Sequence, residues 1–320
     1  MNRFLPDPFI LALLSTVALA TLLPADGAAA TQVGYAATAT VVLLFFLHGV
    51  RLPRENLIAA VAHWRLHLLI LVTTFALFPL FGAALSKVAA GVLPAQLWAG
   101  VLFLCALPST VQASIAYTSM AKGNVAASVA SAAASNLLGI ALTPLLAGLL
   151  LHTQGGGAVP LSGIWKVMLQ LLLPFIVGHA MRPWLAAWAA RQRKLLTYSD
   201  RLTILLSVYS AFSAAVIGGI WSRVPASTLL LLVLVCAVIL AAALLTTRGI
   251  GRLAGFSAAD RRTLLYCGTL KSLVSGVPMA RVLFPSAEIG AIILPVMIYH
   301  QLQLMVCATI ARRQGNETQS

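Results

Sequence analysis

A single lysine with hydroxyl side chains around it is the first feature of this sequence that could do chemistry. Lys271 lies in an apolar segment that runs from about residue 264 to residue 284, about ten residues past Arg262. At helical rise that separation is roughly 15 Å, which would place the lysine at membrane depth. A charge at that depth is expensive and indicates a functional site. Lys271 could pair with an anionic substrate, replace a bound sodium ion as a tethered cation, or carry a coupled proton. The alternative is a structural lysine that reaches the interface with its stem.

The residues around Lys271 are typical of a broken helix. Irregular backbone at membrane depth is tolerated only where it is buried in protein or lines a wet cavity. We expect the helix breaks at Gly268, Gly276 and Pro278. The neighbouring hydroxyl residues are candidates for binding substrate or ion: Thr269, Ser272 and Ser275.

A second polar stretch has the same character. Leu107-Pro108-Ser109-Thr110 interrupts an apolar segment, and Gln112 and Ser114 follow it. A proline removes a backbone donor and disrupts the turn before it, and the polar side chains could supply replacement partners. We therefore predict a helix break at Pro108, with Gln112 and Ser114 as candidate binding residues.

The next apolar segment carries a row of hydroxyl groups. Ser128, Ser131 and Ser135 are spaced i, i+3 and i+7, so they share one helix face, and Asn136 adjoins them. The alternative for each serine is the small-residue packing that membrane helices favour. Together with Asn136, and beside a broken helix, the serines are interpreted as a cavity lining.

The last apolar segment contains Tyr299-His300-Gln301-Leu302-Gln303, in which His300 and Gln303 fall on one face. Polar side chains at this depth need partners. They could line a cavity or form a hydrogen-bond clamp between helices, and we carry both interpretations.

Several classes of chemistry are excluded. A carboxylate proton relay or a metal site within the membrane lacks its ligands, and so does a hydrolase that needs a carboxylate pair. No Ser-His-Asp arrangement follows from the spacings, and the four cysteines form no metal-type pair. We expect no enzyme and no cofactor, with sodium or a proton as the candidate coupling ion. The acidic residues lie at segment ends or in loops: Asp7, Asp26, Glu55, Asp200, Asp260, Glu288 and Glu317.

The elements that must position these residues are helices that cross a membrane. The chain has 320 residues, of which 60% are hydrophobic and 9% charged, and its mean hydropathy is +0.96. These values are typical of a polytopic, all-α membrane protein. Ten apolar segments of about spanning length follow in order: 8–25, 33–50, 65–86, 96–120, 124–151, 163–182, 202–221, 226–247, 261–282 and 287–311.

The basic residues set the expected topology. With the N-terminus inside, 16 of the 21 basic residues fall in inner loops and 4 on the outer side, and Lys271 remains in the membrane. This bias indicates that both termini are cytoplasmic, in a multi-pass protein of the bacterial inner membrane. The net charge of +14 is attributed to this bias, so the expected partner is the lipid bilayer and not a nucleic acid.

Five segments precede Gly155-Gly156-Gly157 and five follow it. Because five is odd, the second half must be inverted relative to the first. We predict a five-helix repeat at residues 1–154 and an inverted repeat at 155–320, with discontinuous helices at the fourth and ninth positions.

These motifs resemble the bile acid:sodium symporter family, and within it the branch that includes solute carrier family 10 member 7. The resemblance covers essentially the whole chain. It rests on Ala121-Lys122-Gly123-Asn124, the Pro108 stretch, Lys271-Ser272-Leu273 with Gly276-Val277-Pro278, and Tyr299-His300-Gln301.

The resemblance implies a core domain with two crossing, discontinuous helices and a panel domain of outer helices, both drawn from both repeats. It implies alternating access for a small organic anion, often with sodium. Ser114 and Ser128 match ion-site positions and would form a vestigial sodium site. The family's acidic ligand in the ninth helix has no counterpart in residues 266–270, which Lys271 follows. We expect weakly coupled, sodium-independent or proton-linked transport. A non-transporting regulator of ion or calcium homeostasis is the alternative, whereas no filter motif favours a channel.

Overall fold

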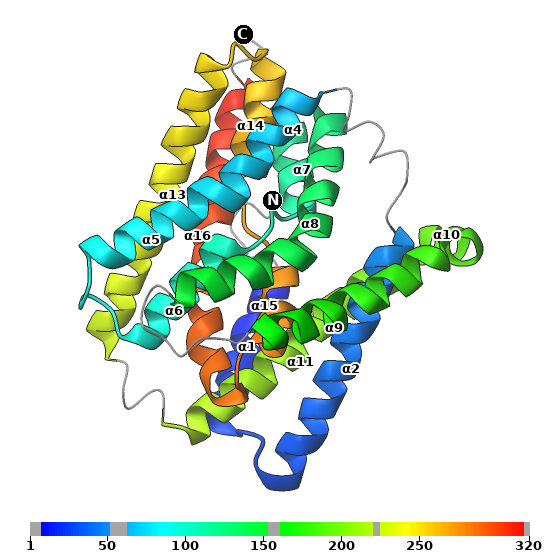
Figure 1. The fold of residues 1–320 in the computed structure, drawn as a ribbon, viewed down its shortest axis with the longest axis vertical. Coiled ribbons are helices and arrows are strands. Elements are labelled where there is room, and N and C mark those ends of the chain that lie inside the picture. Colours follow the sequence, from blue (N-terminus) through cyan, green and yellow to red (C-terminus); the bar gives the residue numbers. More distant parts are fainter. Residues whose placement is uncertain (1–7, 52–62, 153–160, 220–224, 317–320) are drawn as a thin grey trace. The chain divides into compact units, whose positions relative to one another are not determined.

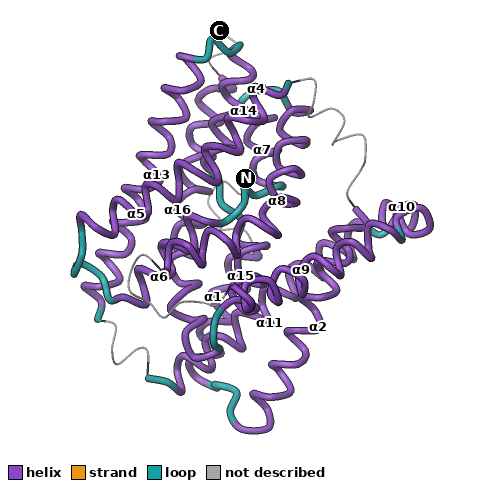
Figure 2. Tube along the Cα trace, viewed as in Figure 1, coloured by secondary structure: helices purple, strands orange, loops and turns teal. Residues whose placement is uncertain are grey.

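The computed structural model describes residues 8–51, 63–152, 161–219 and 225–316. All regular elements in these ranges are helices (Figure 2). The expected linker Gly155-Gly156-Gly157 lies outside the described residues, as do Arg3, Arg54 and Arg223 of the topology count.

The apolar segments of the sequence form the helices. Six described helices are long and apolar enough to cross a membrane: Gly27–Arg51, Trp64–Val88, Val125–Leu151, Lys194–Ile217, Ala226–Leu253 and Ser286–Asn316. The other four expected segments correspond to α1 (Pro8–Leu22), α9 (Leu161–Ala180) and two helices that are each split in two. The chain is therefore a helical protein of the multi-pass membrane type, and the count of ten spans stays a prediction.

The chain divides into two compact units, and each takes segments from both sides of residue 155. The first unit comprises residues 1–51, 169–225 and 277–291, and the second comprises 52–168, 226–276 and 292–320. The predicted repeats at 1–154 and 155–320 are a different division of the chain, based on sequence order, and they stay a prediction.

The first unit is built on α2 (Gly27–Arg51) and α11 (Arg193–Ile217), with α1 and α10 (Arg182–Arg191) beside them. Arg51 Nη1 donates to Asp200 Oδ2 at 2.8 Å and so links α2 to α11. Glycine allows α2 to approach α9 closely. A Cβ on Gly178 would collide with the carbonyl oxygen of Phe46, and a Cβ on Gly49 with that of Phe175.

The second unit contains both helix breaks, one split helix entire, the first half of the other, and the long helices that pack on them (Figure 1). Its elements are α4 (Trp64–Val72), the π-helical turn η1 (Thr73–Leu77), α5 (Phe78–Val88), α6 (Ala95–Ala106), α7 (Gln112–Met120), α8 (Val125–His152), α13 (Ala226–Leu253), α14 (Ala258–Thr269), the start of α15 (Leu273–Leu283) and most of α16 (Ser286–Asn316).

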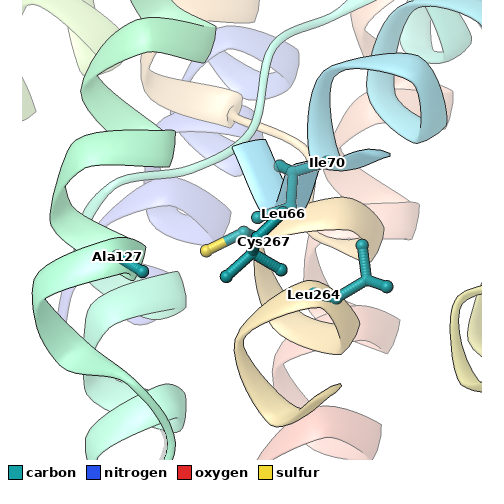
Figure 3. Close-up of a cluster of buried hydrophobic side chains, with 5 residues drawn as sticks. All are labelled: Leu66, Ile70, Ala127, Leu264 and Cys267. Atoms are coloured by element: carbon teal, nitrogen blue, oxygen red, sulfur yellow. The ribbon is translucent and has the colours of Figure 1, made fainter. Parts of the chain in front are cut away.

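The apolar packing inside this unit joins three helices around Cys267 of α14 (Figure 3). Leu66 and Ile70 come from α4, Ala127 from α8 and Leu264 from α14. The sulfur of Cys267 points towards the helix that carries Ala127. This cluster fixes the first half of one split helix against its neighbours.

The breaks themselves fall at residues 107–111, between α6 and α7, and at 270–272, between α14 and α15. Pro108 lies within the first break. The positions expected for the second break are wrong, because Gly268 lies in the last turn of α14 and Gly276 and Pro278 lie inside α15. Their role is close packing: a Cβ on Gly268 would meet Thr73 at 3.3 Å, and one on Gly276 would meet Leu107 at 2.6 Å. Pro278 is the sixth residue of α15, past the four N–H groups that a helix start leaves unpaired, so it removes one donor from inside this helix.

Candidate functional site

The candidate site is formed where the two breaks meet inside the second unit. When a helix ends, the carbonyl oxygens of its last turn lose their partners. Buried in an apolar protein, each such oxygen must find another donor. The carbonyl oxygens at the end of α6 therefore need hydrogen-bond donors from elsewhere in the fold. The residues that supply these donors identify the site.

Backbone and side-chain donors reach every carbonyl oxygen from Leu104 to Ser109. Leu107 N–H donates to Leu104 at 3.2 Å, and Ser272 N–H donates to Pro108 at 2.9 Å. The remaining donors are side chains: Lys271 to Cys105 and Leu107, Thr143 to Ala106, and Asn136 to Ser109.

Lys271 is the donor with the most bonds. Its Nζ lies 2.7 Å from the carbonyl oxygen of Leu107, 3.1 Å from that of Cys105 and 2.9 Å from that of Thr74. An ammonium group has three hydrogens, so these three bonds use all of them. The group also lies 4.1 Å from the centroid of the Phe78 ring, a cation–π distance.

The third acceptor, Thr74, is available because of a π-helical turn. Phe78 N–H donates to the carbonyl oxygen of Thr73, five residues back, and so leaves that of Thr74. The next residue, Pro79, has no N–H to give. The π-turn and the proline thus leave one carbonyl oxygen inside the unit without a helical donor, and Lys271 Nζ donates to it. Such π-turns are frequent at functional sites.

The environment of Lys271 bears on two of its interpretations. The residue is 1% exposed, so a stem that reaches the interface is ruled out. A hydrogen bond to a substrate would need hydrogens that are already donated to backbone oxygens. The charge sits at the carbonyl end of α6, where the helix dipole favours a cation. The arrangement is that of a cation enclosed by carbonyl oxygens.

The backbone of the second break is held by α16. Lys271 N–H donates to Gln303 Oε1 at 2.7 Å, and Gln303 Nε2 donates to the carbonyl oxygen of Lys271 at 2.8 Å. His300 Nδ1 lies 2.9 Å from the same Nε2, and Tyr299 OH donates to the carbonyl oxygen of Thr269 at 3.0 Å. Gln303 thus forms a hydrogen-bond clamp between α16 and the second break, whereas the contact of His300 with Gln303 lies within α16.

Ser272 and Ser275 organise the start of α15. Ser275 N–H donates to Ser272 Oγ at 3.1 Å, which gives Ser272 the position of an N-cap. Ser275 Oγ donates to Asn136 Oδ1 at 2.7 Å. Asn136 also donates from Nδ2 to the carbonyl oxygen of Ser109 at 2.7 Å, so one amide on α8 bridges both breaks.

The three serines of α8 share a face but have different partners. Ser135 Oγ accepts from Ser109 N–H at 3.0 Å, and Ser128 Oγ lies 3.2 Å from Cys267 Sγ. Ser131 Oγ lies 2.6 Å from His67 Nδ1. All three serines are buried, so the structure places them at helix contacts.

Three other candidates lie around this network. Ser114 is buried with its Oγ 3.3 Å from Ser109 Oγ. Thr269 is buried with its Oγ1 3.4 Å from Thr247 Oγ1. Gln112 is exposed at the start of α7, and the structure does not bring its side chain to the others. Within the described ranges no three His, Cys, Asp or Glu residues are grouped to hold a metal ion.

Sequence reasoning missed Thr74, Thr143 and His67. Thr74 contributes a backbone oxygen that is exposed only by the π-turn. Thr143 is a single hydroxyl residue in an apolar helix, and such a hydroxyl commonly bonds to a carbonyl oxygen of its own helix. His67 had a usable signal, since it is a histidine inside an apolar segment. Its Nε2 is buried without a hydrogen-bond partner among the described residues.

An all-helical chain with several membrane-length helices and two joined helix breaks defines a multi-pass integral membrane protein. The SBF-like CPA transporter family matches residues 7–316, so the chain belongs to that family. This result confirms the resemblance inferred from the sequence.

Relatives cover nearly the whole chain. An uncharacterized protein of Pseudomonas aeruginosa, PA2026, is 52% identical over 97% of this chain and 93% of its own length. The protein named "Putative symporter YfeH" of Escherichia coli is 48% identical over 98% of this chain and 94% of its own. Sodium/bile acid cotransporter 7 of Rattus norvegicus is 30% identical over 86% of this chain and 80% of its own.

Proposed function

We propose that this protein is a secondary transporter that moves a small organic anion across the bacterial inner membrane by alternating access. The second unit, which holds both helix breaks, would be the core domain, and the first would be the panel domain. Ten spans with both termini in the cytoplasm belong to this proposal, supported by the charge bias of the loops.

The observation that carries the proposal is the enclosure of Lys271 Nζ by three carbonyl oxygens at 2.7–3.1 Å. Backbone carbonyl oxygens are also the groups that replace the hydration shell of alkali cations in proteins. The ammonium group carries the same single charge as a sodium ion and is attached to the protein. Lys271 would therefore occupy the place of a bound sodium ion, and transport would not require sodium or would be linked to a proton.

The site also supports an anionic substrate. The half-helices α7 and α15 begin at the two breaks, and helix N-termini favour negative charge. Lys271 adds a positive charge nearby without donating a hydrogen bond to the substrate. Ser114 and Ser128 would then be residual ligands of a former ion site, and Lys271 would supply the positive charge that the ion supplied.

Uptake into proteoliposomes tests both statements. A panel of organic anions is offered with a sodium gradient, with a potassium gradient of equal ionic strength, and with a pH gradient. We expect uptake of some anions by the wild type without sodium. Lys271→Ala leaves the three carbonyl oxygens free to bind a cation. In this variant we expect uptake or thermal stability to become dependent on sodium. Lys87→Ala removes an exposed lysine and serves as the control.

Two results would contradict the proposal. If no anion of the panel is taken up under any gradient, the transport function is wrong. If the wild type requires sodium and Lys271→Ala keeps that requirement unchanged, Lys271 does not replace the ion.

A further inference from the structure

A second cation, Arg281, lies in the first unit and has a single side-chain hydrogen bond to the described residues. It belongs to the last turn of α15. Its Nη2 donates to the carbonyl oxygen of Gly34 in α2 at 2.7 Å. Its Nε is buried and has no hydrogen-bond partner among the described residues. A guanidinium has five N–H donors, so most of them are left for a ligand.

No carboxylate of the described part of this unit compensates the charge. Asp200 is paired with Arg51 at 2.8 Å, and this is the ion pair found within 4 Å in the described ranges. Asp26 is exposed and accepts from the backbone N–H of Gly27 at 2.6 Å. Glu288 is exposed at the start of α16. Arg281 therefore has no counter-ion among the described residues of this unit.

The contrast with Lys271 is informative. The lysine is enclosed by acceptors that use every hydrogen of its ammonium group. Arg281 contacts one carbonyl oxygen and keeps a buried, unpaired Nε. A partly buried cation with unused donors is costly in an apolar setting unless an anion joins it. An arginine cannot avoid this cost by deprotonation, and the described residues supply no anion, which favours a ligand as the partner.

We propose that Arg281 binds the anionic group of a ligand, with a carboxylate, sulfonate or phosphate as the chemical class. The planar guanidinium presents paired N–H groups that match two oxygens of such an anion. The hydrogen bond from Nη2 to the carbonyl oxygen of Gly34 fixes the orientation of the guanidinium before the ligand binds. The inference rests on the proposed function in so far as it takes the ligand to be the transported anion, for which Arg281 would determine the charge specificity.

Chemical labelling of the intact wild-type protein tests this site directly. Phenylglyoxal reacts with free guanidinium groups, and mass spectrometry reports the labelled fraction of Arg281. We expect sulfate, benzoate and 2-naphthalenesulfonate to protect Arg281 in a saturable manner, and benzamide, the neutral analogue of benzoate, to leave it reactive. Labelling of Arg281 that none of the three anions reduces would overturn the inference.

Binding to variants provides the second readout, in protein whose folding is checked by its melting temperature. Arg281→Gln is expected to weaken binding of the protecting anions about tenfold or more, because charged hydrogen bonds are lost. Arg281→Lys keeps the charge but loses the paired N–H groups of the guanidinium. Its affinity for the anions should lie between those of the wild type and of Arg281→Gln. Lys87→Gln removes an exposed cation of the other unit and should bind as the wild type does.

The outcomes separate this site from the transport function. Uptake of an anion whose binding is unchanged in Arg281→Gln would overturn the site and leave the transport proposal standing. Sulfate protection that is lost in Arg281→Gln, in a protein that takes up no organic anion, would support the site and contradict the transport proposal.

Discussion

The backbone N–H of Ser272 donates a 2.9 Å hydrogen bond to the carbonyl oxygen of Pro108, so the two helix breaks are joined directly. Lys271 adds two bonds from the second break to the end of α6, and Asn136 adds a bridge from α8. Because these donors replace the bonds that a continuous helix would make, the breaks stabilise each other. Neither can be altered without leaving buried polar groups of the other unpaired.

Replacing Lys271 should therefore destabilise the protein even where its charge is not needed. Lys271→Met keeps most of the apolar stem but leaves the carbonyl oxygens of Thr74, Cys105 and Leu107 without this donor. An unpaired buried acceptor costs ~1–3 kcal/mol, so we expect a loss of roughly 3 kcal/mol or more. Unfolding can be followed with a thiol-reactive dye, because all four cysteines are buried. Lys87→Met is the control, and equal melting temperatures for the two variants would contradict the capping role.

The bridge by Asn136 predicts energetic coupling between two side chains. Ser275→Ala removes one hydrogen bond, from Ser275 Oγ to Asn136 Oδ1 at 2.7 Å, and should cost about 1 kcal/mol. Asn136→Ala also removes the donor to the carbonyl oxygen of Ser109 and should cost about 2–3 kcal/mol. The double variant should lose less than the sum, because both changes remove the same bond.

Denaturation of the four proteins of this cycle measures the coupling. Ser213→Ala is the matched control, since Ser213 Oγ is buried without a partner among the described residues. A serine-to-alanine change there removes no hydrogen bond and should not lower stability. Strict additivity of Ser275→Ala and Asn136→Ala would mean that the bond does not contribute.

Glycines give a prediction that depends on backbone proximity alone. A Cβ on Gly178 would collide with the carbonyl oxygen of Phe46, and the backbone cannot move aside as a flexible side chain can. Gly178→Ala should therefore separate α9 from α2 and sharply lower the yield of folded protein and its melting temperature. Gly249 in α13 has no atom within 4 Å of the place that a Cβ would take, so Gly249→Ala should stabilise slightly, by ~0.5–1 kcal/mol. Equal behaviour of the two variants in size-exclusion and melting experiments would contradict this packing.

The sequence was sufficient to predict the helical class and one of the breaks for a physical reason. Runs of apolar residues can be buried in a bilayer only as helices, and Pro108 cannot continue a helix in the usual way. The clustering of hydroxyl and amide residues near the breaks also follows, because freed backbone groups need partners. The sequence pattern alone is thus sufficient to identify the polar residues around Lys271.

The specific partners could not be predicted, because they depend on contacts between distant segments. Nothing local to Thr74 indicates that its carbonyl oxygen is free; this follows from the π-turn and from Pro79, which follows that turn. The sequence favours helix breaks at Gly268 and Gly276, whereas in the structure their small size serves close packing. From the sequence Arg281 contributes only to the loop charge bias, since its lack of a counter-ion among the described residues is visible only when its neighbours are known.

The contact of His67 with Ser131 provides the last prediction. The two side chains meet at 2.6 Å between α4 and α8, and His67 Nε2 has no partner in the described part of the chain. Ser131→Ala would leave both ring nitrogens unpaired, and we expect a loss of about 1–3 kcal/mol. The double change His67→Leu with Ser131→Ala removes both polar partners and should recover most of this loss, because a buried apolar pair leaves nothing unsatisfied. Ser207→Ala is the control, since its hydroxyl is buried without a partner among the described residues, and it should melt no lower than the wild type. If the double variant is less stable than Ser131→Ala alone, His67 contributes through a partner other than Ser131, and this hydrogen bond is not what fixes α4 on α8.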